Sequence, residues 1–397
     1  MRRWIMLALG TAAQTAACAF VYGIPYLADT LRRQEHLDLT QVGLLVACPT
    51  AGLVLALYLW GAAADRWGER VVIALGLGTA AGALAVAAWA VHGMVALGLV
   101  LVLAGAAGAS VYSASGRLVM GWFTAGERGL AMGIRQTSTP LGMGVAALAM
   151  PPLSDAHGLG GAFGFLAVVC GVIAVLIALF AADPVRPEKA AAGPAPNPYR
   201  GSRLLWRIHG SAALLVVPQF TAGAFALVLL VDVRGWSPVH AGQLIAVAQG
   251  LGAVSRIVVG RWSDRVGERL RPMRQLAVLT AALVGTTAVA TAFPSPLTPV
   301  LLVAAIALTS STNGLSFTST AEHAGPAWSG RALGVHNTGQ NLTAAVVPPL
   351  MAALISATAY WPGFVLAAAT ACASALIIPV PAQAAARVRR ARRTISA

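Results

Sequence analysis

The chain has 397 residues, of which 58% are hydrophobic and only 10% are charged, and its mean hydropathy is +0.75. Soluble globular proteins carry roughly 25% charged residues, so this chain lacks the polar surface that would cover it in water. Its net charge of +14 could suggest nucleic-acid binding, but the basic residues stand between apolar runs and not along one polar face. Composition therefore predicts a membrane protein that binds no nucleic acid.

Apolar stretches of about 20 residues, long enough to cross a bilayer as helices, follow one another along the whole chain. We mark them at 4–28, 40–60, 71–91, 94–120, 130–153, 159–182, 206–231, 238–259, 274–293, 297–321, 331–356 and 359–380. We expect an all-α membrane protein with twelve transmembrane helices in two six-helix bundles. The bundles are predicted at 1–182 and 206–381, joined by a proline-rich cytoplasmic linker at 183–205 and followed by a basic cytoplasmic tail at 382–397.

Lysine and arginine are distributed unevenly between the two sides of this predicted topology. With the N-terminus in the cytoplasm, only Arg32, Arg33 and Arg234 fall in outer loops, and all the other basic loop residues fall inside. Because positive loops stay in the cytoplasm, both termini are predicted there, in an inner-membrane protein with many spans. The start of the chain resembles a signal peptide, but it lacks a convincing small-residue cleavage site, so we expect a retained first span.

The two halves of the chain are repeats of each other. The pattern G-x-x-x-D-R-x-G-E-R occurs at 61–70 and again at 260–269. Further pairs are G-L-A-M-G at 129–133 with G-R-A-L-G at 330–334, and Pro-Pro-Leu at 151–153 with 348–350. Six spans are an even number, so both halves share one orientation and are related by a pseudo-two-fold axis along the membrane normal.

These features together resemble the major facilitator superfamily of secondary transporters, over essentially the whole chain. The matching features are twelve spans, a six-plus-six repeat, a central linker and the charged motif after spans two and eight. Arg117 at the inner end of span four, and E-R-G at 127–129, also resemble the superfamily pattern. The resemblance implies that the motif is a gating latch, which holds the halves together in the outward-facing state. It carries this role to Gly61, Asp65, Arg66, Gly68, Arg70, Asp264, Arg265, Gly267 and Arg269, with Arg117 and Glu127 in the same inner network.

The residue types of the motif fit that role physically. Gly61 removes a side chain where helices approach, and Gly68 permits the turn. Asp65 is expected near the start of the following helix, where the helix dipole favours negative charge. Arg66 and Arg70 would pair with acids or lipid phosphates at the inner interface. The alternative is a positive turn that only fixes topology and has no gating role.

Two further arginines, Arg135 and Arg256, are predicted within spans five and eight. An arginine at membrane depth costs a few kcal/mol, which makes each a functional candidate. Arg256-Ile-Val-Val-Gly260 is similar to the R-x-x-x-G of span eight in oxalate and monocarboxylate transporters, where the arginine pairs with the substrate. The alternative is a structural arginine that extends to the interface.

Neutral polar residues in the spans that line the pathway of this superfamily form a second group of candidates. With the two arginines, the candidate substrate-binding residues are His336, Gln14, Gln219, Tyr112, Asn313 and Asn337. Hydrogen bonding between helices is the alternative for each of them. As a set they predict a polar cavity with few charges.

Energy coupling is left open by the sequence. No acid lies deep within a span, so a proton, the candidate coupling ion, would have to be carried by Asp29, Asp232 or His336. A uniporter or an anion exchanger stays open. No G-x-x-x-x-G-K-[ST] pattern suggests ATP binding, and the four cysteines have no metal-like spacing. We therefore expect no cofactor and no metal site.

The leading hypothesis is secondary transport of a small organic solute by rocker-switch alternating access, with a carboxylate anion as the narrower hypothesis. The partners expected are this solute and membrane lipids, with the monomer as the functional unit. Proton-coupled drug or metabolite efflux is the runner-up, although span five lacks the full G-x-x-x-G-P-x-x-G-G pattern. A membrane receptor or sensor with a transporter fold is the third hypothesis. An enzyme is not expected, since no paired acids or Ser–His set lies at membrane depth.

Overall fold

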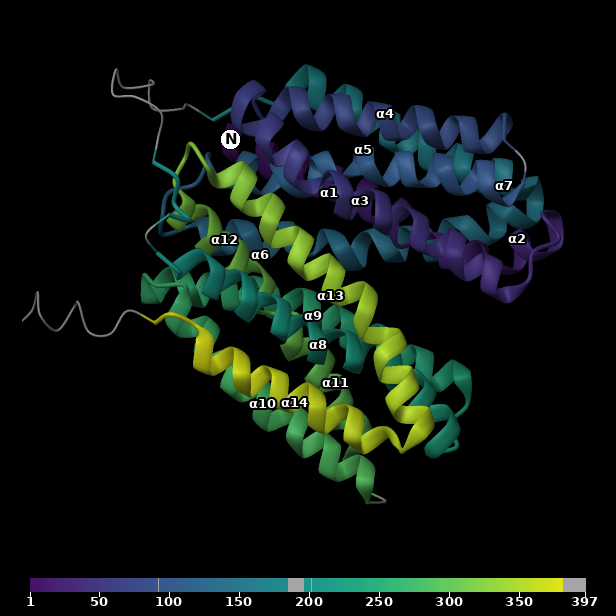
Figure 1. Ribbon diagram of the computed structural model, residues 1–397, viewed down its shortest axis with the longest axis vertical. Coiled ribbons are helices and arrows are strands. Elements are labelled where there is room, and N and C mark those ends of the chain that lie inside the picture. Colours follow the sequence, from purple (N-terminus) through teal and green to yellow (C-terminus); the bar gives the residue numbers. More distant parts are fainter. Residues whose placement is uncertain (92, 185–195, 201, 294, 381–397) are drawn as a thin grey trace, which may run out of the picture.

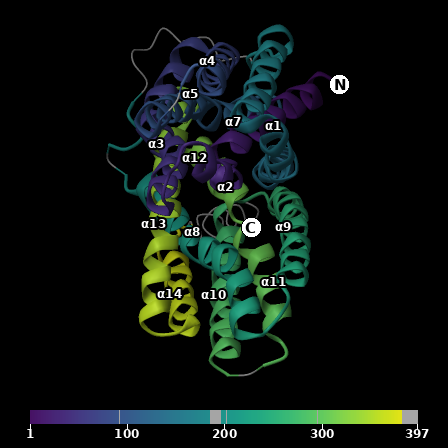
Figure 2. The same ribbon diagram turned by 90° about the vertical axis from the view of Figure 1, so that its right-hand side faces the viewer.

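The computed structural model describes residues 1–91, 93–184, 196–200, 202–293 and 295–380, without the side chains of residues 29, 39, 238 and 239. Within this part of the chain all regular structure is helical. Most of the predicted linker and the whole predicted tail lie outside the described residues. The helices form an upper group, α1 to α7, and a lower group, α8 to α14 (Figures 1 and 2).

The first half contains seven α-helices and one 3-10 turn in its described residues. They are α1 (Arg2–Val21), η1 (Ile24–Leu27), α2 (Ala28–Gln34), α3 (Leu39–Trp67), α4 (Glu69–Trp89), α5 (Met94–Met120), α6 (Arg128–Gln136) and α7 (Ser138–Phe180). A capping box starts α3: the Asp38 carboxylate accepts from Gln41 N at 2.8 Å, and Gln41 Oε1 accepts from Asp38 N at 3.0 Å. These bonds satisfy backbone donors that a helix start would otherwise expose.

The described residues of the second half form seven α-helices and one π-helical turn. They form α8 (Leu204–Val228), a π-helical turn η2 (Leu229–Val233), α9 (Pro238–Val266), α10 (Leu270–Ala292), α11 (Thr298–Thr309), α12 (Asn313–Ala324), α13 (Ser329–Ala357) and α14 (Tyr360–Ile377). The predicted linker, 183–205, begins after the end of α7 at Phe180 and includes the first two residues of α8, which starts at Leu204.

The two groups of helices lie close together at one end of the molecule and diverge toward the other (Figure 1). The N-terminus and the end of α14 both lie at the converging end. So do the two motif segments, 61–70 and 260–269, because each begins in the last turns of a helix, α3 or α9, that runs toward that end. We call this the latch end, and the other the open end.

Eleven helical segments of the described chain are long and apolar enough to cross a membrane. One of them, Arg128–Phe180, has 53 residues and would be about 80 Å long if straight, far more than a bilayer of about 30 Å. It turns back at Gly158, whose φ is 66° and whose conformation is not helical. This segment therefore makes two crossings, and the twelve predicted spans are all present.

Two predicted spans are interrupted. Span ten, predicted as continuous, divides into α11 and α12 around Ser310, Ser311 and Thr312. Span five breaks at Thr137, between α6 and α7. A break in a membrane helix frees backbone carbonyls, which are tolerated where they face a cavity. Both breaks lie beside the arginines predicted at membrane depth.

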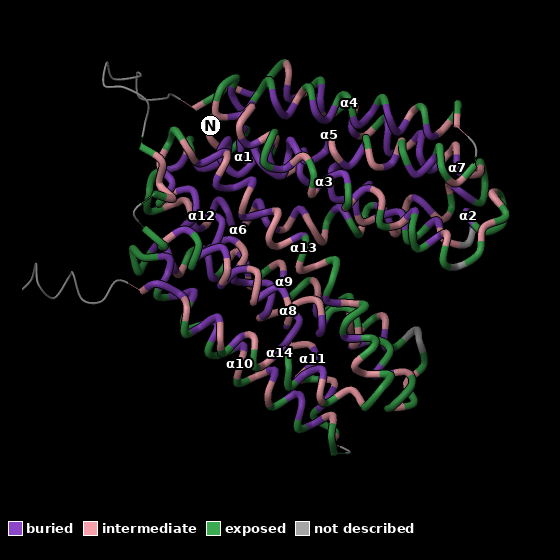
Figure 3. The backbone as a smooth tube through the Cα atoms, viewed as in Figure 1, coloured by how far each residue is buried: buried purple, intermediate pink, exposed green. Residues whose placement is uncertain are grey.

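Large apolar side chains cover the outside of both groups. Leu55, Leu148 and Leu376 are more than 70% exposed, and exposed residues follow the outer faces of the helices (Figure 3). Such a surface would aggregate in water, but it matches a hydrocarbon solvent.

The motif segments are more helical than predicted. We expected a turn after residue 60, but α3 continues to Trp67 and α4 starts at Glu69. Gly68 alone makes the turn, with φ at 96°, a conformation that glycine adopts without strain. Gly267 ends α9 in the same way, with φ at 73°. In these helix ends Arg66 and Arg265 are exposed, whereas the side chains of Asp65 and Asp264 are only 5% and 1% exposed.

Candidate latch and substrate cavity

Asp65 binds the second half of the molecule. Its carboxylate accepts from Gly330 N at 2.9 Å and from Arg331 N at 3.1 Å, in the first turn of α13. The Arg331 guanidinium adds a bond from Nε at 2.9 Å. The helix dipole does favour this acid, but the prediction named the wrong helix. Asp65 is in the last turn of α3, and the N-terminus that it caps belongs to the opposite half.

Asp264 makes the corresponding contact in the reverse direction. Its carboxylate accepts from Gly129 N and Leu130 N, both at 2.8 Å, in the first turn of α6. Arg269 of its own half donates to Asp264 from Nη1 at 2.7 Å and to Ala125 O, across the halves, from Nη2 at 2.5 Å. Each motif copy thus places a carboxylate on a helix N-terminus of the other half, a favourable place for negative charge.

Glycines let the helix backbones touch at both contacts. A Cβ atom on Gly61 would lie 2.4 Å from Gly330 O, and one on Gly260 would lie 2.1 Å from Gly129 O. Both distances are far below van der Waals contact, so no larger residue fits without separating the helices. We call the pair of contacts around Asp65 and Asp264 the latch.

The other arginines of the motif lie outside the latch. Arg70 donates to Ala178 O of its own half, and Arg66 and Arg265 are exposed at the helix ends. The prediction that Arg70 shares the gating role of Arg269 is not supported by its position. The turn itself is held within the first half, since Asp183 accepts from Glu69 N and Arg70 N at 2.8 Å each.

Arg117 and Glu127 do not form the shared network that we expected. Arg117 is buried and pairs with Asp65 and Glu69. Glu127 instead pairs with Arg3 at the start of α1, at 2.9 Å. Arg117 therefore joins the latch, whereas Glu127 holds α1 to its own half.

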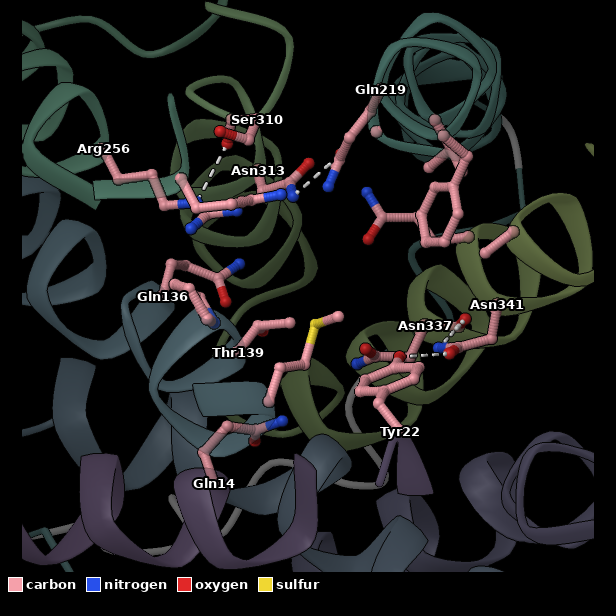
Figure 4. Close-up of a pocket in the computed structure, with 18 of the residues that line it drawn as sticks. Gln14, Tyr22, Gln136, Thr139, Gln219, Arg256, Ser310, Asn313, Asn337 and Asn341 are labelled. Carbon is pink, nitrogen blue, oxygen red and sulfur yellow. Dashed lines mark hydrogen bonds between the residues drawn. The ribbon is translucent and has the colours of Figure 1, made fainter. Parts of the chain in front are cut away.

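A cavity of about 340 Å³ lies between the two halves (Figure 4). It is lined from both sides by polar side chains set among apolar ones. The polar residues are Gln14, Tyr22, Tyr112, Arg135, Gln136, Thr139, Gln219, Gln249, Arg256, Ser310, Asn313, Asn337, Gln340 and Asn341. No acidic residue is among the described residues that line it.

Arg135 lies in the last turn of α6 and is 2% exposed. Its Nη2 donates to Gln14 Oε1 at 2.9 Å and to Ser115 Oγ at 2.7 Å, and its guanidinium lies 5.9 Å from the centre of the Phe317 ring. Nη1 has no hydrogen-bond partner among the described residues. Neutral groups thus orient this cation, and no carboxylate among the described residues neutralises it.

Arg256 lies on α9 in the opposite half and is 5% exposed. Its Nε donates to Ser310 O at 3.2 Å, at the break between α11 and α12 (Figure 4). Its Nη1 also lacks a hydrogen-bond partner within the described ranges. The interrupted helix therefore supplies the carbonyl that orients this guanidinium, which points into the cavity and not to the interface.

The neutral candidates also lie at the cavity. Asn313 donates to Gln219 Oε1 at 3.2 Å within the second half. Asn337 donates to Tyr112 O at 3.1 Å, and this bond joins the two halves. Tyr22 and Phe317 are among the lining residues to which the sequence reasoning assigned no role. Tyr22 donates to Asn341 Oδ1 at 3.2 Å, another bond between the halves. Its only signal in the sequence was its place in span one, predicted at 4–28.

His336 is the exception among the candidates. It is buried, but it does not line the cavity. Its ring faces α8 and α12, where it contacts His209 and Ser316. The prediction that His336 binds substrate directly is therefore not supported, because α13 turns this residue away from the cavity while its neighbour Asn337 points toward it.

The remaining predicted residues lie away from the cavity. Asp232 is exposed in η2, Asp29 lies in α2 with its side chain outside the described residues, and Cys372 is exposed on α14. In the described part of the chain no three metal-binding side chains come together.

Comparison with known proteins identifies the family. The model of the Major Facilitator Superfamily matches residues 5–348. The chain belongs to this superfamily. An uncharacterized MFS-type transporter of Mycobacterium tuberculosis is 41% identical over 380 residues, which is 95% of this chain and 85% of that protein. The predicted family and fold class are confirmed, and the protein is a multi-pass membrane transporter.

Solved structures of the superfamily share its fold. The human organic anion transporter MFSD10 superposes with a TM-score of 0.74 at 17% identity, covering 95% of this chain and 99% of that one. FucP, crystallised in the outward conformation, superposes with a TM-score of 0.73 at 13% identity, with coverage of 95% and 99%. These similarities show a shared fold, and membership of the superfamily supports secondary transport by alternating access.

Three latch residues were missed in the sequence: Arg331, Arg128 and Glu322. Arg128 lies 3.7 Å from Glu322, and Arg269 lies 3.6 Å from the same carboxylate. The repeat did contain a signal, because residues 129–133 and 330–334 match each other. A superfamily member whose halves are symmetric must bring each motif copy to the matching segment of the other half.

Proposed function

We propose that this transporter carries a small organic anion with a carboxylate group, and that Arg135 and Arg256 bind it. One guanidinium comes from each half, so a carboxylate between them would contact both halves. Rocking of the halves about this bound anion is the rocker-switch movement that its superfamily fold supports.

The observation that carries the proposal is a set of buried donors without acceptors. Arg135 Nη1, Arg256 Nη1 and Gln340 Nε2 have no hydrogen-bond partner in the part of the chain that the structure describes, and all three residues line the cavity. Leaving a buried charged donor unpaired costs several kcal/mol. A carboxylate offers two oxygens and a negative charge, which would satisfy these donors. The same two positive charges disfavour cationic solutes, including cationic drugs, as cargo.

We further propose that the latch end faces the cytoplasm, so that this structure is outward-facing. The latch closes the end where the two halves converge. The arginines of the motif segments lie at this end, and positively charged loops favour the cytoplasmic side.

Exchange of labelled carboxylates across proteoliposome membranes tests the proposal. A panel of mono- and dicarboxylates should exchange against unlabelled carboxylate inside, while neutral sugars and amines should not. Arg256→Gln and Arg135→Gln should each reduce carboxylate exchange at least tenfold. Arg256→Lys keeps the charge and should retain part of the activity.

Arg261→Gln is the matched control, because Arg261 lies on the same helix as Arg256 but is exposed. It should exchange like the wild type. Equal exchange by wild type, Arg256→Gln and Arg135→Gln would overturn the anion site, and exchange of sugars in place of carboxylates would overturn the substrate class.

A further inference from the structure

Two histidines of the second half are in direct contact behind the cavity wall. Nδ1 of His209 on α8 lies 3.0 Å from Nδ1 of His336 on α13. Both side chains are buried, at 7% and 1% exposure. Neither contacts the cavity, but the ring of Phe317, which does, packs edge-on against His336 at 4.7 Å.

Hydroxyl groups continue this pair in both directions. Tyr199, at the end of the linker that precedes α8, places its hydroxyl 3.0 Å from His209 Nε2. Ser316 on α12 places its hydroxyl 3.1 Å from His336 Nε2. The chain Tyr199–His209–His336–Ser316 therefore leads from the linker at the latch end to the helix that carries Asn313 and Phe317. Each link has a group that can both donate and accept.

The geometry sets how many protons the pair can hold. A neutral imidazole carries one N–H, and the Nδ1–Nδ1 contact requires hydrogen on only one of the two atoms. The ring that donates from Nδ1 then accepts at its Nε2 from a hydroxyl. One added proton can occupy that Nε2 if the hydroxyl rotates and accepts. A second added proton would have to enter between the two Nδ1 atoms and would break the contact. The capacity is therefore one proton above the neutral pair.

The surroundings favour the neutral pair in this conformation. No described acid is bonded to either ring; Glu322, on the adjacent helix, pairs with Arg269 and Arg128 instead. Other titratable groups near the chain are His323, which bonds to Ser319 O, and Tyr58, near Tyr199. Arg135 also lies beyond the Phe317 ring. A buried imidazolium without an acid partner costs free energy, and this cationic neighbour adds to the cost.

Access to the pair is closed by aromatic rings at the latch end. Tyr199 packs against Trp206 at 5.1 Å and against Trp328, beside the start of α13, at 6.5 Å. Burial, with a smaller effect of Tyr58, raises the pKa of Tyr199 to about 12, so its hydroxyl keeps its proton at neutral pH. Trp328 immediately precedes the turn of α13 that Asp65 binds. Release of the latch would therefore loosen the packing of Trp328 against Tyr199 and admit water to the histidine pair.

We propose that His209 and His336 form a binding site for one proton, loaded from the latch-end face through Tyr199 when the latch opens. Proton binding then stabilises the latch-open state, since the closed state excludes the charged pair. This inference rests on the proposed transport function for its consequence in transport, but not for proton binding itself.

Proton binding can be measured without any substrate. In protein labelled with ¹⁵N at the histidine rings, the two rings should together carry two ring N–H groups at pH 9 and three at pH 5.5. His209→Gln should change the titration of His336, and His323→Gln should leave it unchanged. A pair that stays neutral down to pH 5.5 would overturn the proton site.

The effect on transport is read from carboxylate exchange with equal pH on both sides of the membrane. Lowering the pH from 8 to 6 should increase wild-type exchange, by at most about tenfold per pH unit because one proton is bound. His336→Gln and His209→Gln should exchange at a rate that changes less than twofold over this range. Tyr199→Phe should lose most of the increase, whereas His323→Gln should keep it.

The two proposals fail in different ways. Absence of carboxylate exchange in the wild type at every pH would remove the anion function, while the ¹⁵N spectra would still decide the proton site. Normal exchange with the same pH dependence in wild type and His336→Gln would overturn the link between proton and latch, and would leave the anion site intact.

Discussion

The two copies of the charged motif perform the same contact with different chemistry. In both, a carboxylate in the last turn of a helix, Asp65 or Asp264, accepts two backbone N–H groups of the other half. The guanidinium that joins them differs in origin. Arg331 reaches Asp65 across the halves, whereas Arg269 comes from the same motif as Asp264.

This difference follows from where the charges of spans four and ten stand. Span four provides a cation, Arg117, and therefore Asp65 and Glu69 of the first copy neutralise it. Span ten provides an acid, Glu322, and therefore Arg269 of the second copy turns toward it. The two motif copies thus make the same contact between a carboxylate and a helix start, but the neighbouring span supplies a positive charge in the first half and a negative charge in the second. We therefore expect the free energy needed to break the two contacts to differ.

The largest expected effect comes from the glycines. Gly260→Ala places a methyl group against the backbone at Gly129 O and should abolish the closed latch; Gly61→Ala should act similarly. The population of the closed-latch state can be followed by pulsed electron paramagnetic resonance, which measures the distance between spin labels attached at Arg66→Cys and Arg265→Cys. Cys48 and Cys372 are first replaced by serine so that they are not labelled.

Gly250→Ala and Gly43→Ala are the matched controls, because a Cβ at either position meets no atom within 4 Å. Both should keep the closed distance. A closed population in Gly260→Ala equal to that of the wild type would contradict the role of backbone contact.

A smaller effect is expected from the aspartates, and it should be unequal. Asp264→Asn leaves Arg269, whose side chain is 6% exposed, with Glu322 at 3.6 Å as its one acidic partner among the described residues, beside the neutral acceptors Ser263 Oγ and Ala125 O. Breaking such a buried pair costs about 3 to 5 kcal/mol. Asp65→Asn leaves Arg117 with Glu69, and Arg331 is 29% exposed and can turn to water. For Asp65→Asn we therefore expect the closed latch to be destabilised by about 1 to 3 kcal/mol. The same distance measurements give both values, and an equal loss would refute the asymmetry.

The smallest effects concern the arginines that cross the halves. Arg331→Gln loses a bond of 2.9 Å to Asp65, while Arg128→Gln loses a contact of 3.7 Å to Glu322. Partly exposed pairs contribute about 0.2 to 1 kcal/mol, so Arg331→Gln should shift the closed population slightly more. Arg70→Gln should not shift the closed population, since the side chain of Arg70 donates to Ala178 O of its own half and to no other described residue. A shift as large as that of Arg331→Gln would show a latch role that this contact does not explain.

Much of the fold could be predicted because lipid imposes it. Spans of about 20 apolar residues must be helices, and the repeat of the motif showed that the halves share one orientation. The positions of helix breaks were not predictable in the same way. Ser310, Ser311 and Thr312 are compatible with a continuous helix, and only packing against Arg256 shows why α11 ends there.

The cavity was predicted in part. Arg135 and Arg256 were predicted because an arginine at membrane depth is energetically costly and is therefore a functional candidate. Both do line the cavity. His336 was an equal candidate in the sequence, since it lies one residue before Asn337. A helix turns by about 100° per residue, so adjacent residues face different neighbours, and the sequence does not say which face meets the cavity.

By itself, the sequence determined the family, the number of spans and the presence of uncompensated positive charge among them. These properties depend on composition, order and repetition, which need no distances. Only the tertiary structure decided which carboxylate meets which helix. Asp65 is separated by 265 residues from Gly330, and no local preference of the chain encodes that contact. It arises because two similar halves pack face to face, so that each motif copy ends on the helix start of the other half.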